Sequence, residues 1–143
     1  MPIQVMLVED DDDIRLVLCQ AMRHRFNVAE FADARSALEH LRNGDAPYQV
    51  AVVDLWMPGM DGLTLIEKMQ ADERLRRIAI IIITGIADRE LPESFWTRNL
   101  GIAGFFHKPF HPEDLIRKIE DVVRAQIGLP PGDEAQGPRG GYL

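Results

Sequence analysis

Short apolar runs recur along the chain, separated by longer segments in which apolar residues have helical spacing. The runs cover residues 3–8, 28–31, 50–53, 78–83 and 103–106. Each has the length of a strand, and three contain the continuously apolar, largely β-branched stretches VMLV, VAVV and IAIIII. Strands of this kind are typically buried on both faces under helices. The pattern therefore predicts a parallel sheet.

Four apolar stripes at a spacing of three and four residues predict helices after these strands. The stripes comprise Ile14, Val17, Leu18, Ala21 and Met22; Ala34, Ala37, Leu38 and Leu41; Leu63, Ile66 and Met69; and Leu115, Ile116, Ile119, Val122 and Val123. Pro112 is expected in the first turn of the last helix. Segment 88–100 contains Pro92, so its helix is expected to start late or to be broken. A β-α unit repeated five times with right-handed crossovers gives a doubly wound α/β fold.

Length and composition set the domain organisation. The chain has 143 residues, enough for one domain, and 46% of them are hydrophobic, which is enough for a core. Residues 128–143 contain five Gly and three Pro without periodicity. We therefore expect one domain over residues 1–127, followed by a flexible tail or linker stub over 128–143.

Charge and cysteine content exclude several classes of protein. The net charge of −7 has the wrong sign for binding nucleic acid directly. The longest apolar run has six residues, against about 20 for a membrane span. The N-terminus lacks the basic start of a secretory signal, and Cys19 is the single cysteine, so no disulfide framework is expected. These features favour the cytoplasm.

Five consecutive carboxylates, residues 9–13, stand where the first strand ends and the first helix begins. In a doubly wound sheet, ligands bind at that edge. Capping of the first helix by Asp12 or Asp13, together with the preference of the helix dipole for acids, would explain about two of the five carboxylates. Charges about 4 Å apart repel by about 4 kcal/mol at an effective dielectric of 20, so gathering the others calls for a cation. A cluster with oxygen ligands alone favours Mg²⁺, with Mn²⁺ as a possible substitute.

Three further polar residues are expected at the same edge. Asp54 follows the third strand, Thr84 ends the fourth and Lys108 follows the fifth. Taken singly, each residue has an ordinary explanation: Asp54 as a cap or turn residue, Thr84 as a turn hydroxyl and Lys108 as a surface lysine. Together they suit phosphoryl transfer to a carboxylate: Asp54 attacks, Thr84 donates a hydrogen bond and Lys108 supplies positive charge, while Mg²⁺ links the carboxylate to the phosphoryl oxygens.

Four motifs in this order resemble the receiver domain of two-component response regulators. They are LVEDDDDIR, VVDLWMPGMDGL, IIITG and FFHKPF, and the resemblance extends from residue 3 to about residue 127. It implies a (βα)5 flavodoxin-like sheet with strand order 2-1-3-4-5.

The resemblance also implies a role for individual site residues. Asp54 matches the phosphoacceptor, Asp10 a direct Mg²⁺ ligand, and Glu9 an acid that holds the ion through water. The backbone carbonyl of Trp56 would complete the metal ligands. Residues 11–13 match no such role and are expected to cap or begin the first helix.

Further positions match the part of the family site that senses the phosphoryl group. Thr84 and Lys108 would contact it, and Phe105 would be an aromatic switch that turns inward with Thr84. Gly85, Ile86 and Pro109 would line the site, with a cis Lys108–Pro109 peptide. Because Trp56 and Ile86 are bulky and apolar where water must approach, we predict slow self-dephosphorylation.

The implied function is phosphorelay signalling. Asp54 would accept a phosphoryl group from a phosphohistidine of a sensor histidine kinase or phosphotransfer protein. This would switch the surface formed by the fourth helix, fifth strand and fifth helix. The target would be a downstream protein, a missing output domain or a second copy in a phosphorylation-dependent homodimer. Such a chain is a regulator rather than an enzyme.

Two alternatives remain. One is a pseudo-receiver, a binding module with the same fold that is not phosphorylated. The other is a haloacid dehalogenase-type phosphatase. That enzyme needs a second acid two positions after the nucleophile, where this chain has Trp56.

Overall fold

The five apolar runs form the strands of a single parallel sheet in this computed structural model, which describes residues 2–85, 102–130 and 132. The strands are β1 (Ile3–Val8), β2 (Phe26–Phe31), β3 (Val50–Asp54), β4 (Ala79–Thr84) and β5 (Ile102–His107). Their order is β2-β1-β3-β4-β5, and all four neighbouring pairs are parallel. The predicted fold and strand order are confirmed.

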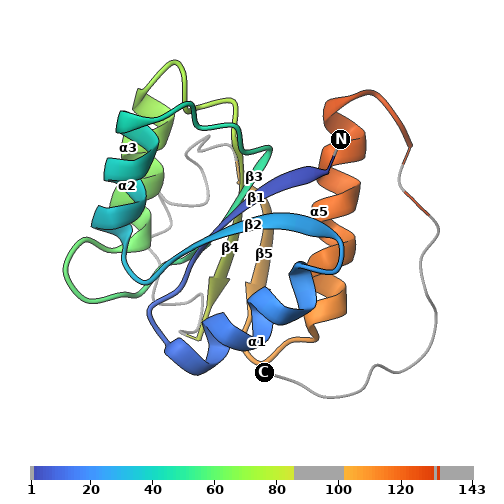
Figure 1. Cartoon of the computed structure of the whole chain (residues 1–143), viewed down its shortest axis with the longest axis horizontal. Coiled ribbons are helices and arrows are strands. Elements are labelled where there is room, and N and C mark those ends of the chain that lie inside the picture. The colour runs from blue at the N-terminus through green and yellow to red at the C-terminus, as the bar shows by residue number, and fades with distance from the viewer. Residues whose placement is uncertain (1, 86–101, 131, 133–143) are drawn as a thin grey trace.

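Helices cover both faces of the sheet, as the alternating pattern predicts (Figure 1). They are α1 (Asp12–Met22), α2 (Ala34–Asn43), α3 (Gly62–Ala71) and α5 (Pro112–Gln126). Successive strand residues point to opposite faces. In β3, Val53 packs into the core under α2 and α3, whereas Val52 packs into the core under α1 and α5. The central strands β1, β3 and β4 are thereby buried on both sides, which is why their runs are continuously apolar. The edge strands β2 and β5 are only partly buried.

The first helix differs from its predicted apolar stripe. Val17 is 43% exposed, and Cys19 is buried in its place beside Leu18 and Met22. The helix faces the sheet through the line of residues 18, 19 and 22, and residue 17 lies one helical step of about 100° to the solvent side of residue 18. The assignment of Val17 to the core is therefore wrong.

The helices α1 and α5 begin where the sequence predicts, but the N-cap residue of α1 differs from the predicted one. Asp11, rather than Asp12 or Asp13, is the N-cap of α1, and its side chain accepts hydrogen bonds from the amides of Asp13 and Ile14 at 2.9 and 3.0 Å. Pro112 occupies the first turn of α5, as expected.

Some predicted features lie outside the described residues. They are segment 88–100 with Pro92, the site-lining residue Ile86, and residues 131 and 133–143 of the tail. The start of the tail is described: the Leu129 amide donates to the Arg124 carbonyl at 2.8 Å, and the Gly132 amide donates to Asp121 Oδ1 at 3.2 Å. The described start of the tail therefore packs back against the C-terminal half of α5.

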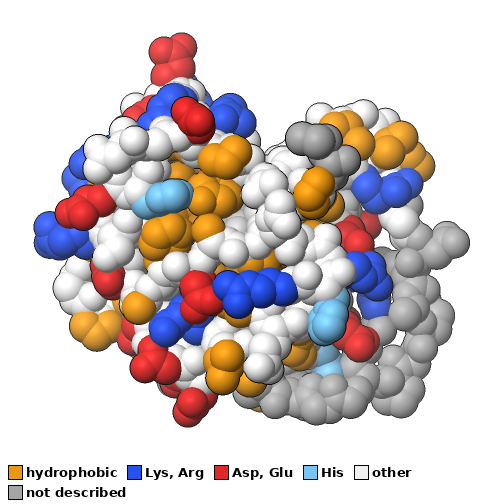
Figure 2. Space-filling view, in the orientation of Figure 1, with side chains coloured by type: hydrophobic (Ala, Val, Ile, Leu, Met, Phe, Trp, Pro, Cys, Tyr) orange, Lys and Arg blue, Asp and Glu red, His pale blue; other side chains and the backbone are white. Residues whose placement is uncertain are grey.

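The surface carries mixed charge. On the face in Figure 2, Lys and Arg side chains are interspersed with Asp and Glu rather than gathered in one basic patch. Within the described part of the chain, every helix is too short or too polar to cross a bilayer.

Candidate functional site

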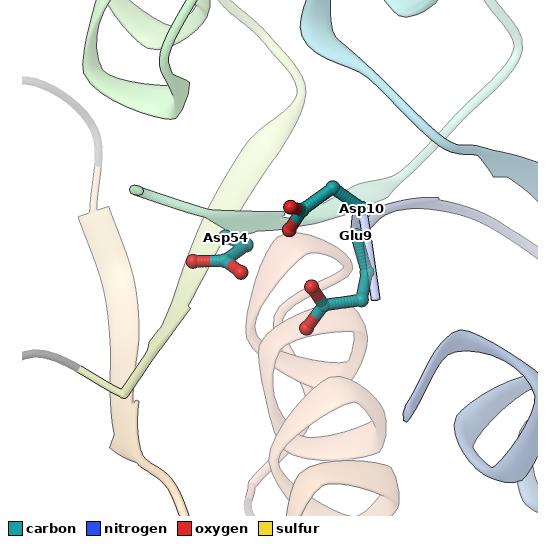
Figure 3. A group of neighbouring side chains, drawn as sticks. All are labelled: Glu9, Asp10 and Asp54. Carbon is teal, nitrogen blue, oxygen red and sulfur yellow. The ribbon is translucent and has the colours of Figure 1, made fainter. Parts of the chain in front are cut away.

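Three carboxylates meet at the C-terminal edge of the sheet. Glu9 and Asp10 follow β1, Asp54 ends β3, and these two strands are hydrogen-bonded neighbours. One carboxylate oxygen from each residue lies within 4.8 Å of the other two, and Figure 3 shows Glu9 and Asp10 turned toward Asp54. The sheet topology therefore brings together acids that are 44 residues apart in the chain.

Burial makes this cluster suited to a cation. Glu9 is fully buried and Asp54 is 4% exposed, whereas Asp10 is half-buried. Buried carboxylates lose their hydration and repel each other unless positive charge balances them. Among the described residues, Lys108 is the lysine that pairs with this cluster, and it contacts Glu9 and Asp54. The three carboxylates therefore form a donor set that fits a divalent cation with hard oxygen ligands.

Lys108 provides the positive charge within the cluster. Its Nζ lies 2.5 Å from Glu9 Oε1 and 3.1 Å from Asp54 Oδ2, and its side chain is 15% exposed. The Lys108 amide donates to the Thr84 carbonyl at 2.8 Å, which extends the β4–β5 pairing by one bond. The Lys108–Pro109 peptide is cis, as the sequence predicts.

Burial and the close contacts within the cluster shift the pKa values of both Glu9 and Lys108. Burial, and then hydrogen bonding to Asp54, raises the pKa of Glu9 from 4.5 to about 8, while Lys108 acts in the opposite direction. Burial alone would lower the pKa of Lys108, but its hydrogen bond to Glu9 and the nearby charge of Asp54 raise it. Glu9 therefore releases its proton readily only above neutral pH or when positive charge arrives.

Divalent cation binding is expected to tighten as pH rises from about 6 to about 8, because the cation must displace the proton of Glu9. Over the same range the metal-free protein should lose stability, because folded Glu9 retains a proton that the unfolded chain, with its ordinary pKa of 4.5, has released. Tryptophan fluorescence titrations with Mg²⁺ and denaturant at several pH values measure both trends. Glu9→Gln should flatten them, and a pH-independent affinity in the native chain would contradict the prediction.

The hydroxyl predicted at this edge is in place. Thr84 ends β4 and is fully buried, one residue beyond the residue that pairs with Asp54. Gly85 follows directly, and a side chain there would approach Lys108 Cδ at 3.8 Å, an ordinary contact distance. Thr84, Gly85 and Lys108 thus lie at one edge with Asp54, as the sequence predicts. Their contact with a phosphoryl group stays a prediction.

Trp56 follows β3 and Phe105 lies on β5, as the sequence predicts, but the Trp56 side chain is partly exposed whereas Phe105 packs against the core. The Trp56 amide donates to Asp54 Oδ1 at 3.1 Å, while its side chain is 40% exposed. Phe105 is half-buried on β5 against the core under α2 and α3, with its ring centroid 4.9 Å from that of His107. A metal-binding role for the Trp56 carbonyl and a switching role for Phe105 stay predictions.

Two features of the site were not predicted from the sequence. Asp61 is the N-cap of α3, and the adjacent Gly62 lies so close to β3 that an added Cβ would collide with the Asp54 carbonyl. Arg15 donates to the Glu9 carbonyl at 2.8 Å. Asp61, Gly62 and Arg15 all lie within the receiver-like motifs of the sequence, but only the folded chain shows which backbone groups they contact.

Comparisons with known proteins agree with this geometry. The family model described as "Response regulator receiver domain" matches residues 5–120. A Brucella abortus protein named "Response regulator receiver protein CpdR" is 35% identical over 124 residues, covering 85% of this chain and 98% of the relative. The Pseudomonas aeruginosa "Chemotaxis protein CheY" is 30% identical over 127 residues, covering 87% and 99%.

Solved structures give the same answer. A CheY-like response regulator receiver domain protein from Methanospirillum hungatei has a TM-score of 0.77 and 28% sequence identity, covering 89% of this chain and 98% of the other. The five-stranded parallel sheet with acids, threonine and lysine at its C-terminal edge is that of a signalling receiver. The chain belongs to the response regulator receiver domain family of two-component systems.

Proposed function

We propose that Asp54 accepts a phosphoryl group from the phosphohistidine of a sensor histidine kinase or a phosphotransfer protein. The main support for this proposal is the set of groups that contact or surround the Asp54 carboxylate. Its Oδ2 lies 3.1 Å from Lys108 Nζ, its Oδ1 accepts from the Trp56 amide, and Glu9 and Asp10 stand beside it. Both oxygens are therefore held in place, which favours one direction of attack.

The transfer forms one bond and breaks another. A carboxylate oxygen of Asp54 attacks phosphorus, the P–N bond of the donor breaks, and the donor histidine leaves with a solvent proton as neutral imidazole. Lys108 balances negative charge on the phosphoryl oxygens, and the Thr84 hydroxyl donates to one of them. Mg²⁺, when held by Glu9, Asp10 and Asp54, would supply the remaining positive charge for this step.

The consequence of phosphorylation is a change of surface. Thr84 and Phe105 lie on the neighbouring strands β4 and β5, so a movement of Thr84 toward the phosphoryl group would reach the surface that includes β5 through Phe105. We propose that this surface contacts a downstream protein, an output domain or a second copy, together with the fourth helix that the sequence predicts in segment 88–100, outside the described residues. The chain would act as a regulator that assists its own phosphorylation.

The test is the intact mass after incubation with a small acyl-phosphate donor, with and without Mg²⁺. We expect a Mg²⁺-dependent gain of one phosphoryl group that is lost in Asp54→Ala. Asp45→Ala, which removes an exposed acid from the loop between α2 and β3, should retain the gain. Failure of the native chain to gain mass would favour the pseudo-receiver, a binding module that is not phosphorylated.

Loss of the phosphoryl group should be slow. Trp56 places a bulky apolar side chain two residues after Asp54, where a water molecule must approach the acyl phosphate. Mass spectrometry after removal of the donor measures the half-life, and Trp56→Ala should shorten it. Leu129→Ala, an exposed apolar residue at the far end of α5, serves as the control. A half-life of seconds in the native chain would contradict this prediction.

A further inference from the structure

Arg15 joins three elements at the edge of the candidate site. Its side chain leaves α1 and is only 15% exposed. Nη1 donates to the Glu9 main-chain carbonyl at 2.8 Å, Nη2 to Asp12 Oδ1 at 2.6 Å, and Nε to Glu30 Oε1 at 3.2 Å. One planar guanidinium therefore connects the end of β1, the first turn of α1 and strand β2.

The carbonyl that Arg15 holds belongs to the peptide between Glu9 and Asp10. On the other side of Glu9, its amide donates to the Phe31 carbonyl at 3.0 Å, and the Asp11 amide donates to Glu9 Oε2 at 3.2 Å. Because a peptide unit is planar, holding its carbonyl also fixes the direction of the chain entering Asp10. Arg15 thus binds the peptide that links two of the three clustered acids.

Arg15 is itself anchored at a second point. Glu30 on β2 binds Arg15 through Oε1 and Arg23 Nη2 through Oε2, the latter at 2.8 Å. Burial would raise the pKa of Glu30, but hydrogen bonds from the Cys19 thiol and the two arginines lower it, so Glu30 stays ionised. Arg15 and Arg23 balance Glu30 and Asp12 in charge. This local neutrality fits a structural clamp better than an anion-binding group.

We propose that Arg15 is a positioning residue for the metal site: by clamping the Glu9–Asp10 peptide against Glu30, it sets both carboxylates in the arrangement that binds a divalent cation. The inference rests on the proposed function, because it assigns Arg15 to the site that would hold Mg²⁺. Groups that orient metal ligands without touching the metal typically change its affinity by 10-fold to 100-fold when removed.

A pair of charge-matched variants tests this role. Arg15→Gln and Arg23→Gln each remove one positive charge beside Glu30, so long-range electrostatics alone would tighten Mg²⁺ binding in both. Positioning predicts the opposite for Arg15→Gln, about tenfold weaker binding. Arg23→Gln should bind as the native chain or slightly more tightly. Mg²⁺ titrations followed by tryptophan fluorescence and by the amide chemical shifts of Asp10 and Asp11 give the affinity without any phosphoryl donor.

Arg15→Lys separates geometry from charge, because one ammonium keeps the charge but cannot reach Glu9, Asp12 and Glu30 together. Its affinity should lie between those of the native chain and Arg15→Gln. Native affinity in Arg15→Gln, or in Arg15→Lys if Arg15→Gln does not fold, would overturn the inference and leave the proposed function standing. A native chain that binds no Mg²⁺ would overturn both.

Discussion

Lys108→Met is expected to lower the free energy of unfolding by about 3 kcal/mol near pH 8 without metal, because removing one partner leaves buried carboxylates without balancing charge. Glu9 and Asp54 both contact Lys108 Nζ, and both are almost fully buried. Denaturant unfolding measures the loss. Lys68→Met, which removes an exposed lysine from α3, should stay within about 0.5 kcal/mol of the native chain.

The loss in Lys108→Met has a distinctive dependence on pH. Without Lys108 the pKa of Glu9 should rise further, because Lys108 lowers it in the native chain. Near pH 6 Glu9 holds its proton in both chains, so the loss should shrink, and it should grow as Glu9 of the native chain ionises near pH 8. Phosphorylation by an acyl phosphate should slow by a factor of about 100 or more, the usual effect of removing one group that stabilises transition-state charge. A variant as stable as the native chain at both pH values would show that the ion pairs contribute nothing net.

Much of the fold follows from the apolar pattern because burial on both faces leaves few alternatives for strands such as 50–53 and 78–83. The ends of elements were less predictable. The second strand starts at Phe26, two residues earlier than its apolar run, because neighbouring β1 offers pairing partners from Ile3 onward. Backbone hydrogen bonding extends a strand past its apolar residues, and the sequence carries no separate signal for that extension.

The site could be predicted as a set of residues but not as a set of contacts. Asp54, Thr84 and Lys108 were found because parallel strands end at one edge of the sheet. The sequence does not show that Lys108 bridges Glu9 and Asp54, since that contact depends on the reach of a flexible side chain across three strands.

Close backbone approaches were the least predictable feature. Gly62 follows Asp61 in the sequence, and an Asp-Gly pair is typical of an ordinary turn. In the folded chain its amide donates to the Leu55 carbonyl at 2.9 Å, which brings the first turn of α3 against the end of β3. Only the three-dimensional packing shows that a side chain there has no room.

Gly62→Ala is expected to lower the free energy of unfolding by about 3 kcal/mol, the upper range for overpacking. Helix propensity acts in the other direction, because alanine in place of glycine favours α3 by about 1 kcal/mol at most. The collision is larger: the new Cβ would lie 2.8 Å from both the Asp54 carbonyl carbon and the Leu55 Cα, which are rigid backbone atoms. Relief of the clash must move the segment that carries Asp54.

The same substitution should therefore damage the site as well as the fold. Under native conditions, Gly62→Ala is expected to show weaker Mg²⁺ binding and slower acyl-phosphate phosphorylation. Gly59→Ala is the matched control in the same loop, because its Cβ would meet nothing within 4 Å. Its φ of 77° makes alanine cost about 1 kcal/mol, but nothing pushes on Asp54. If Gly62→Ala were as stable and as readily phosphorylated as Gly59→Ala, the collision with β3 would not be the reason for glycine at position 62.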